Sequence, residues 1–159
     1  MSRGLPQLGR ALCWLRRGLV RLALAGSMLP AMAGAAPLAE PDARTVRQVV
    51  EAQLAAFAAG DAVRAFGHAS ASIQAQFGDA DNFMRMVQSG YPMVIRPAAV
   101  SFFQAQAEPG DMGSVAQTVL LRDRQGRLWQ ASYSLERQSG GGWRIGGCVV
   151  VADRGHTST

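Results

Sequence analysis

Residues 114–152 decide the fold, and they read SVAQTVLLRDRQGRLWQASYSLERQSGGGWRIGGCVVVA. Three strand-like segments lie within them, at 114–122, 127–138 and 143–152. The links between these segments, DRQG and SGGG, are short and contain glycine, as the turns of β-hairpins do. The stretch therefore predicts an antiparallel meander of three strands.

Two further strand-like segments precede this meander. Residues 100–107 form the longer one, which the link PGDMG joins to the meander. Residues 93–95 form a shorter one, which Arg96-Pro97 ends because proline cannot donate to a central ladder. We therefore expect a sheet of four to five strands.

The side chains of the meander indicate how the sheet is covered. Trp129 and Tyr133 share one face of segment 127–138, since successive strand residues point to opposite faces. Both faces of that segment mix polar and apolar residues. We expect one face to pack on helices and part of the other to line a wet space, while Trp143 and Ile145 fill the core.

A long helix is predicted before the sheet. In residues 43–60 apolar side chains recur every three or four positions, which is the pattern of an amphipathic helix. Asp42 offers an N-cap oxygen, and Gly60 is a natural C-terminal stop. The apolar stripe consists of Val46, Val50, Leu54 and Phe57.

Three shorter helices are predicted to follow. They span residues 62–70, 71–77 and 82–89. Asp61 begins the first of them, while Asp79 or Asp81 caps the third and Gly90 ends it. The side chains expected to face inward are Val63, Phe66, Phe83, Met86 and Val87.

Helices followed by one antiparallel sheet predict an α+β domain, with N-terminal helices packed on one face of a curved sheet. Residues 42–153 fit a single domain, because the sequence shows no internal repeat and no sign of a second domain. Residues 36–41 are predicted to form a Pro/Ala linker, and residues 154–159 a disordered polar tail.

The first 35 residues are predicted to be a signal peptide. Five arginines and no acidic residue precede residues 22–33, which are uncharged and end in small residues. A basic region, a short apolar core and an A-x-A exit are typical of secretory signals. We expect cleavage between Ala35 and Ala36. The apolar core is too short for a membrane span of about 20 residues, so no span should remain after cleavage.

The export route follows from the same segment. Arg16-Arg17 resembles the start of a twin-arginine signal, but general secretion is favoured because nothing downstream requires folding around a cofactor first. The expected location is periplasmic or secreted.

Removing the leader changes the charge balance. The chain has 16 basic and 11 acidic residues, a formal net charge of +5. Five arginines lie in the leader, so sixteen minus five leaves eleven basic residues against eleven acidic ones. A neutral mature chain without a basic stripe argues against a nucleic-acid partner.

Cysteine and histidine give no sign of a cofactor or a metal. Cys13 lies in the leader, which leaves Cys148 alone in a valine-rich segment, where a free cysteine behaves as a small buried hydrophobe. His68 and His156 are far apart in the sequence. We therefore predict no disulfide, no metal and no cofactor, and a capping or surface position for His68.

Two motifs, GYPMVIRP at 90–97 and WRIGGC at 143–148, resemble those of the bacterial family known as domain of unknown function 4864. The resemblance covers residues 46–153. It departs from the family pattern at Ala71, where members usually carry proline. The resemblance implies the fold of nuclear transport factor 2, also called cystatin-like or SnoaL-like, in which a curved sheet wraps a long helix and often leaves a pocket. It implies no activity.

Five residues are candidates for ligand binding: Gln53, Tyr91, Arg96, Trp129 and Tyr133. Gln53 is a polar residue within the apolar stripe of the long helix. Tyr91, Arg96 and Tyr133 could form an anion pocket, because an Arg fork suits a carboxylate or phosphate. Alternatively, Arg96 pairs with Asp61 or with carbonyls at a helix end. Trp129 could belong to the core or to a stacking wall.

No residue is predicted to be catalytic, because none of the carboxylates is an obvious buried base. The sequence favours an exported, non-catalytic module that binds a small molecule or a protein. Two alternatives remain open. One is a cofactor-independent isomerase or cyclase, and the other is a structural homodimer.

Overall fold

The computed structural model describes residues 37–108, 110–111 and 113–153. The predicted signal peptide, its cleavage site between Ala35 and Ala36, and the predicted tail 154–159 lie outside the described residues.

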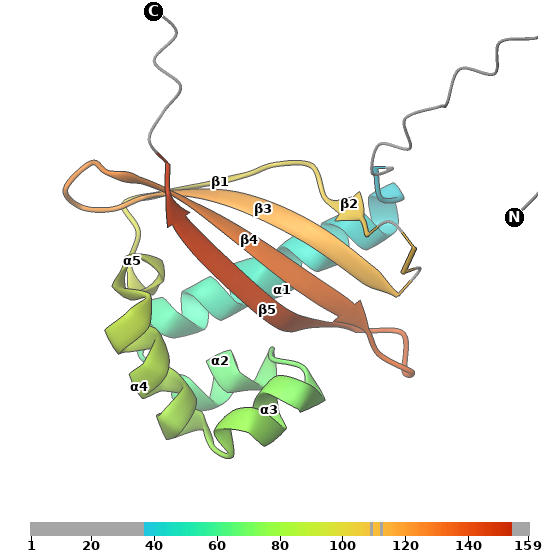
Figure 1. The fold of residues 1–159 in the computed structure, drawn as a ribbon, viewed down its shortest axis with the longest axis horizontal. Helices are drawn as coiled ribbons and strands as arrows, with labels where there is room; N and C mark the ends of the chain where they lie inside the picture. Colours follow the sequence, from blue (N-terminus) through green and yellow to red (C-terminus); the bar gives the residue numbers. More distant parts are fainter. Residues whose placement is uncertain (1–36, 109, 112, 154–159) are drawn as a thin grey trace, which may run out of the picture. The chain divides into compact units, whose positions relative to one another are not determined.

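Helices come first along the chain and strands follow (Figure 1). The helices are α1 Glu40–Ala59, α2 Ala62–Gly67, α3 Ala71–Phe77, α4 Ala80–Gly90 and α5 Pro92–Ile95. The strands are β1 Ala99–Phe102, β2 Gln106–Ala107, β3 Ser114–Arg122, β4 Leu128–Arg137 and β5 Trp143–Ala152. The predicted α+β class is confirmed.

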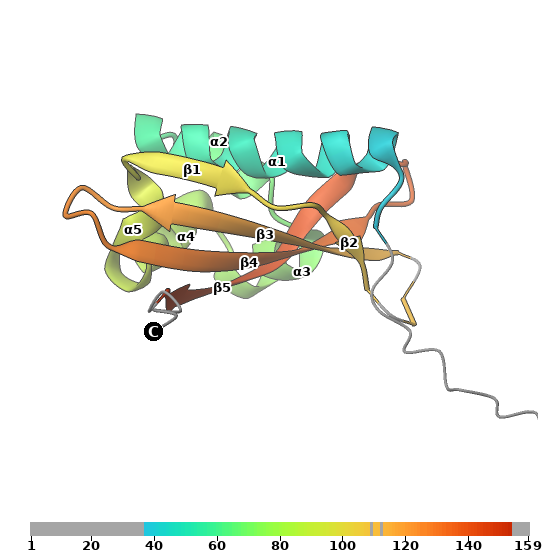
Figure 2. The same ribbon diagram turned by 90° about the horizontal axis from the view of Figure 1, so that it is seen from above.

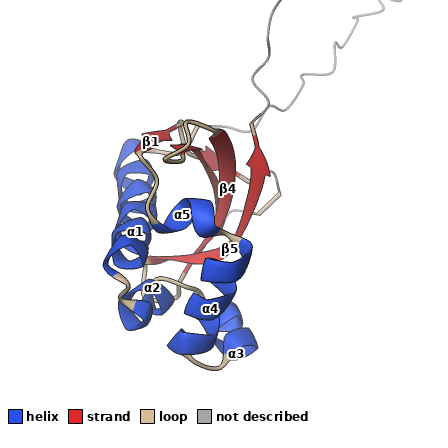
Figure 3. Ribbon diagram, turned by 90° about the vertical axis from the view of Figure 1, so that its left-hand side faces the viewer, coloured by secondary structure: helices blue, strands red, loops and turns tan. Residues whose placement is uncertain are grey.

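The five strands form one antiparallel sheet in the order β1-β3-β4-β5, and β2 also pairs with β3. The predicted meander corresponds to β3, β4 and β5, and the bounds of β3 and β5 agree with the prediction to the residue. The helices lie on one face of the twisted sheet (Figures 2 and 3). The other face of β3, β4 and β5, called here the outer face, carries none of the described helices.

Helix α1 supplies the predicted apolar stripe to the core. Val46, Val50, Leu54 and Phe57 are all buried. Gly60 ends the helix with a φ of 70°, a left-handed conformation that glycine adopts at little cost. Burying such a side chain contributes about 1.5–3 kcal/mol, so the stripe is a main source of the α1–sheet attachment.

The start of α1 differs from the prediction. The helix begins at Glu40 rather than after Asp42, and so includes the last two residues of the predicted linker. Pro41 fits the first turn because its missing N–H would have no intrahelical partner there. Asp42 is therefore not the N-cap. Its carboxylate accepts a hydrogen bond from the Trp143 indole at 3.4 Å and pairs with Arg137 at 2.5 Å.

Two segments predicted as single strands behave differently. Residues 93–95 are not a strand but part of α5, because Pro92 occupies the first turn of a short helix. Segment 100–107 divides into β1 and β2. Between them, the side-chain amide of Gln117 donates to the Phe103 carbonyl at 2.8 Å, which takes that carbonyl out of the regular ladder.

The short helices follow the predicted caps but not all the predicted faces. Asp61 accepts from the Arg64 backbone N–H at 2.9 Å, and Asp79, not Asp81, caps α4. Val63 was expected to face inward but is exposed, because six-residue α2 buries one narrow side around Ala65. In α4 the buried residues are Phe83, Met84 and Val87, whereas Met86 is half-buried.

A β-bulge at Gly146 sets which side chains of β5 face the helices. Ser134 pairs with Gly147 while Leu135 pairs with Ile145, so Gly146 is the extra residue. The extra residue reverses the alternation, because side chains along a strand point to opposite faces in turn. A Cβ at position 146 would lie 2.3 Å from a carboxylate oxygen of Glu136, so the flexible Glu136 side chain would have to move to admit a larger residue.

No helix among the described residues is both long enough and apolar enough to cross a membrane.

Candidate functional site

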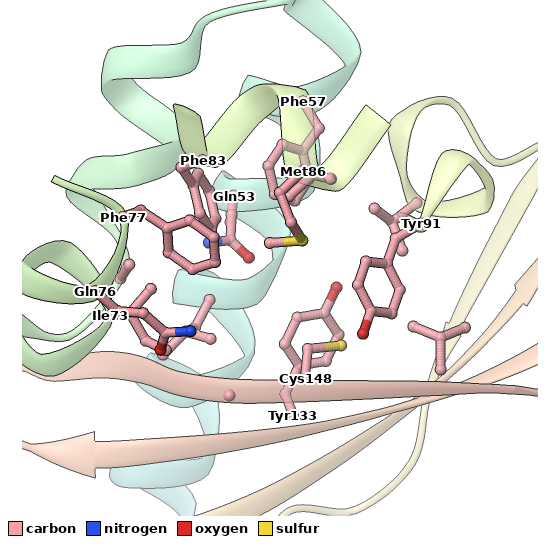
Figure 4. Close-up of a pocket in the computed structure, with 16 residues that line it drawn as sticks. Gln53, Phe57, Ile73, Gln76, Phe77, Phe83, Met86, Tyr91, Tyr133 and Cys148 are labelled. Atoms are coloured by element: carbon pink, nitrogen blue, oxygen red, sulfur yellow. The ribbon is translucent and has the colours of Figure 1, made fainter. Parts of the chain in front are cut away.

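A pocket of about 500 Å³ lies between the helices and the inner face of β4 and β5 (Figure 4). We call it the inner pocket. Helices α1, α3 and α4 and the segment before α5 supply most of its wall, and β4 and β5 supply the rest. The volume lies within the usual range of about 300–1,000 Å³ for small-molecule sites.

An aromatic cluster forms the helical wall of the inner pocket. The ring of Phe83 lies 6.0 Å from Phe57, 5.4 Å from Phe66 and 5.5 Å from Phe77, measured between ring centroids. These separations fall in the favourable range for aromatic pairs. Phe83 thus joins four different helices and fixes the shape of this wall.

Gln53 brings a polar group into the otherwise apolar face of α1. Its side chain is 3% exposed, and its amide nitrogen donates to the Ala65 carbonyl at 3.2 Å. In Figure 4 the amide oxygen of Gln53 points into the inner pocket. One end of this amide therefore supports α2, and the other faces the pocket.

Tyr133 and Cys148 form a second polar group on the sheet side. The two residues are directly opposite each other on β4 and β5, and their side chains hydrogen-bond. Burial raises the pKa of the Cys148 thiol to about 12, even though the Tyr133 hydroxyl acts in the other direction. Burial also raises the pKa of Tyr133 well above its ordinary value. Both side chains are neutral at physiological pH.

Tyr91 lies where α4 ends and α5 begins. Its backbone N–H donates to the Val87 carbonyl at 2.8 Å, which fixes the bend between the two helices. The side chain is half-buried and lines the inner pocket, with its hydroxyl directed toward the sheet (Figure 4).

The structure brings together three of the five candidate ligand residues. Gln53, Tyr91 and Tyr133 line the inner pocket, whereas Arg96 and Trp129 do not. The structure therefore does not bring Arg96 together with the two tyrosines. The guanidinium is instead held at the end of α1, where its Nε donates to the Ala58 carbonyl at 2.9 Å. This is the helix-end alternative considered for Arg96.

Arg96 and Trp129 line a separate, charged depression of about 600 Å³, called here the outer groove. Asp123, Arg124 and Arg127 also line it. The carboxylate of Asp123 is buried and accepts from the Trp129 indole at 3.0 Å and from the Arg127 guanidinium at 2.8 Å. Burial alone would raise the pKa of Asp123, but these hydrogen bonds outweigh it and hold the pKa below its usual value.

Several pocket residues were not predicted. Cys148 and Val150 face the inner pocket because of the bulge at Gly146, and Ile73 and Met86 belong to short helices whose placement depends on tertiary packing. For Cys148 the only signal in the sequence would have been its pairing with Tyr133, because residues that pair across two strands share a face of the sheet.

His68 occupies the C-cap of α2 and does not line the inner pocket. Burial, together with the positive charges of Arg144 and Arg64, lowers its pKa from 6.5. In the part of the chain that the structure describes, no group of three or more His, Cys, Asp or Glu side chains could hold a metal ion.

Residues 39–158 match the model of a family described as Domain of unknown function (DUF4864). No curated protein matches the chain.

Proposed function

Because the chain belongs to the DUF4864 family, whose description assigns no activity, we propose a function from the pocket: the domain binds a small molecule between its helices and its sheet without transforming it. We also propose that the fold is of the nuclear transport factor 2 type. The long helix α1 packed against the inner face of an antiparallel sheet supports this assignment (Figure 3).

One observation carries the binding proposal. Gln53 and Tyr133 are 3% and 2% exposed, yet both have polar ends at the inner pocket. Burying a polar group costs free energy unless it is hydrogen-bonded, and an apolar core residue would avoid that cost. A cavity of ligand size with a few convergent polar groups is the usual form of a small-molecule site.

The same lining argues against proton-transfer chemistry. An isomerase or cyclase needs a base within hydrogen-bond reach of its substrate. None of the described lining residues is Asp, Glu or His. Cys148 and Tyr133 are poor bases or nucleophiles, because burial keeps both protonated. Binding is therefore the function that this pocket supports best.

A pocket-filling variant tests the proposal. Val150 lines the inner pocket, so Val150→Phe should fill part of it, whereas Val63→Phe places the same ring on an exposed face of α2. We expect compounds from a ligand screen to raise the melting temperature of the wild type and of Val63→Phe, but not of Val150→Phe. A screen with no stabilising compound, or one in which Val150→Phe responds like the wild type, would contradict the proposal.

We propose that the protein is exported, with a signal peptide that ends between Ala35 and Ala36. The basic leader, its short apolar core and its A-x-A exit support this proposal. N-terminal sequencing of the protein from the periplasmic and culture fractions should give a chain that begins at Ala36. Recovery of the soluble protein with Met1 in the cytosol would refute it.

A homodimer is the second candidate, supported by the outer face of β5. Val149 and Val151 are 64% and 52% exposed there, although both are apolar strand residues. Two copies could cover these valines by pairing outer face to outer face. Sedimentation equilibrium should then show a dimer for the wild type and a monomer for Val149→Arg. A wild-type monomer at all concentrations would exclude this candidate.

A further inference from the structure

The inner pocket has no charged lining. Among the sixteen described residues that line it there is no Asp, Glu, Arg or His, and the sequence contains no lysine. The ionisable side chains are Tyr91, Tyr133 and Cys148, and the last two stay neutral for the reason given above. A charged ligand group would thus lose its hydration here without meeting an opposite charge, which is strongly unfavourable.

The polar groups of the pocket suit a neutral hydrogen-bonding group instead. The amide nitrogen of Gln53 is already bonded to Ala65, which leaves the amide oxygen as an acceptor toward the pocket. The hydroxyls of Tyr91 and Tyr133 also belong to the pocket lining, and each can donate or accept. A hydroxyl or a carbonyl can use these partners, whereas an ionised group needs more of them.

Apart from the amide of Gln76 and the thiol of Cys148, the rest of the lining consists of apolar side chains and glycine. Phe77, Phe83, Ile73, Met86 and Val150 face the same space, and the sulfur of Met86 lies near its centre (Figure 4). Such a wall favours an apolar ligand body, at roughly 25 cal/mol per Å² of apolar surface buried. Methionine also adapts to irregular shapes, which suits a flexible hydrocarbon.

Charged residues gather in the outer groove instead. Arg96, Arg124, Arg127 and Asp123 all line that groove, and none of them lines the inner pocket. The described residues thus separate a neutral site from a charged one, and this gives a clear expectation about which ligands the inner pocket rejects.

We infer that the inner pocket takes an electrically neutral, mainly apolar molecule with a single hydroxyl or carbonyl group, and that it rejects carboxylates and ammonium ions with the same hydrocarbon skeleton. This inference rests on the proposed binding function and narrows it to one ligand class.

Three probes with the same number of carbon atoms test the inference on the full-length chain: octanol, octanoate and octylammonium, at neutral pH. Calorimetry and ligand-dependent melting should show octanol binding at least about tenfold more tightly than either ion. Val150→Phe should abolish the octanol signal. Equal or tighter binding of octanoate that Val150→Phe also abolishes would overturn the ligand class and leave pocket binding intact. If no probe binds, the ligand class fails, while the ligand screen with Val150→Phe and Val63→Phe still decides the binding function.

A charge placed in the wall gives an independent test. Met86→Lys puts a cation beside the pocket, and Gln88→Lys puts the same charge on the exposed side of the same helix. We expect Met86→Lys to favour octanoate over octanol, while Gln88→Lys keeps the wild-type order. An unchanged order in folded Met86→Lys would contradict the inference. The comparison of the three probes on the wild type is decisive by itself if the lysine variant does not fold.

Discussion

Replacing Phe83 by alanine tests the aromatic wall of the inner pocket most directly. Phe83 is 6% exposed and is in ring contact with Phe57, Phe66 and Phe77. Truncation of a buried phenylalanine costs about 3–5 kcal/mol, of which part is the cost of the cavity left behind. Because Phe83 already borders an open pocket, that cavity cost is smaller here. We expect a loss of about 3 kcal/mol.

This loss converts into a measurable change in melting temperature. Unfolding entropy is about 2.1 cal/mol/K per residue, which for residues 39–158 amounts to about 0.25 kcal/mol/K. The predicted fall in melting temperature is therefore about 12 °C. Urea unfolding followed by circular dichroism should give the same loss of free energy, provided that the slope against urea is unchanged.

Phe103 offers a matched control. It is also a phenylalanine, but its side chain is 56% exposed, and its contact with Gln117 is made by its backbone carbonyl, which accepts a hydrogen bond. Phe103→Ala should cost no more than about 1 kcal/mol. Equal losses for the two variants, or a loss below about 1 kcal/mol for Phe83→Ala, would refute the packing described for α1, α2, α3 and α4.

Two further predictions concern titratable groups. The pKa of Cys148 is raised from 9.0 to about 12, so iodoacetamide should alkylate this thiol roughly a thousandfold more slowly in the folded chain than in urea. Mass spectrometry of the peptide that contains Cys148 measures both rates. Similar rates would contradict the buried Tyr133–Cys148 pair. The pKa of His68 is lowered in the folded state, so the unfolded chain binds the proton more readily than the folded chain does. The stability that neutral His68 contributes is therefore complete above pH 6.5 and is lost as the pH falls toward the pKa of the folded state. The imidazole NMR signal that disappears in His68→Gln should titrate with a midpoint below 6.5. A midpoint at or above 6.5 would contradict the lowering of the pKa by burial and by the charges of Arg144 and Arg64.

The sheet could be predicted from the sequence because its determinants are local. Alternating side chains and glycine-bearing links located β3, β4 and β5. The break between β1 and β2 depends on the side chain of Gln117, which reaches a carbonyl 14 residues away, and no local pattern reports such a contact. The helix α5 was missed because Val94 and Ile95 suit a strand, whereas Pro92 fits the first turn of a helix equally well.

The candidate site was predictable only in part. Gln53 stood out as a polar residue in an apolar stripe, and Tyr133 followed from the alternation along its strand. The bulge at Gly146 decides whether Cys148 or Val149 faces the inner pocket, and its position depends on pairing with β4. Phe77 and Met86 are apolar residues of types that are common in any protein core, so the sequence does not distinguish them as pocket residues. Their place in the pocket wall depends on how the short helices pack.

The contact between Asp42 and Trp143 joins positions 101 residues apart and has a consequence for how the chain is made. During synthesis α1 leaves the ribosome early, but its sheet partner β5 comes near the end of the domain. Contacts this distant in sequence form late, because a long loop must close before they bring any gain. The part of the apolar face of α1 that packs on β5 therefore stays exposed to solvent until the last strand of the domain has been translated. A chaperone that binds exposed apolar segments can bind this helix during that interval.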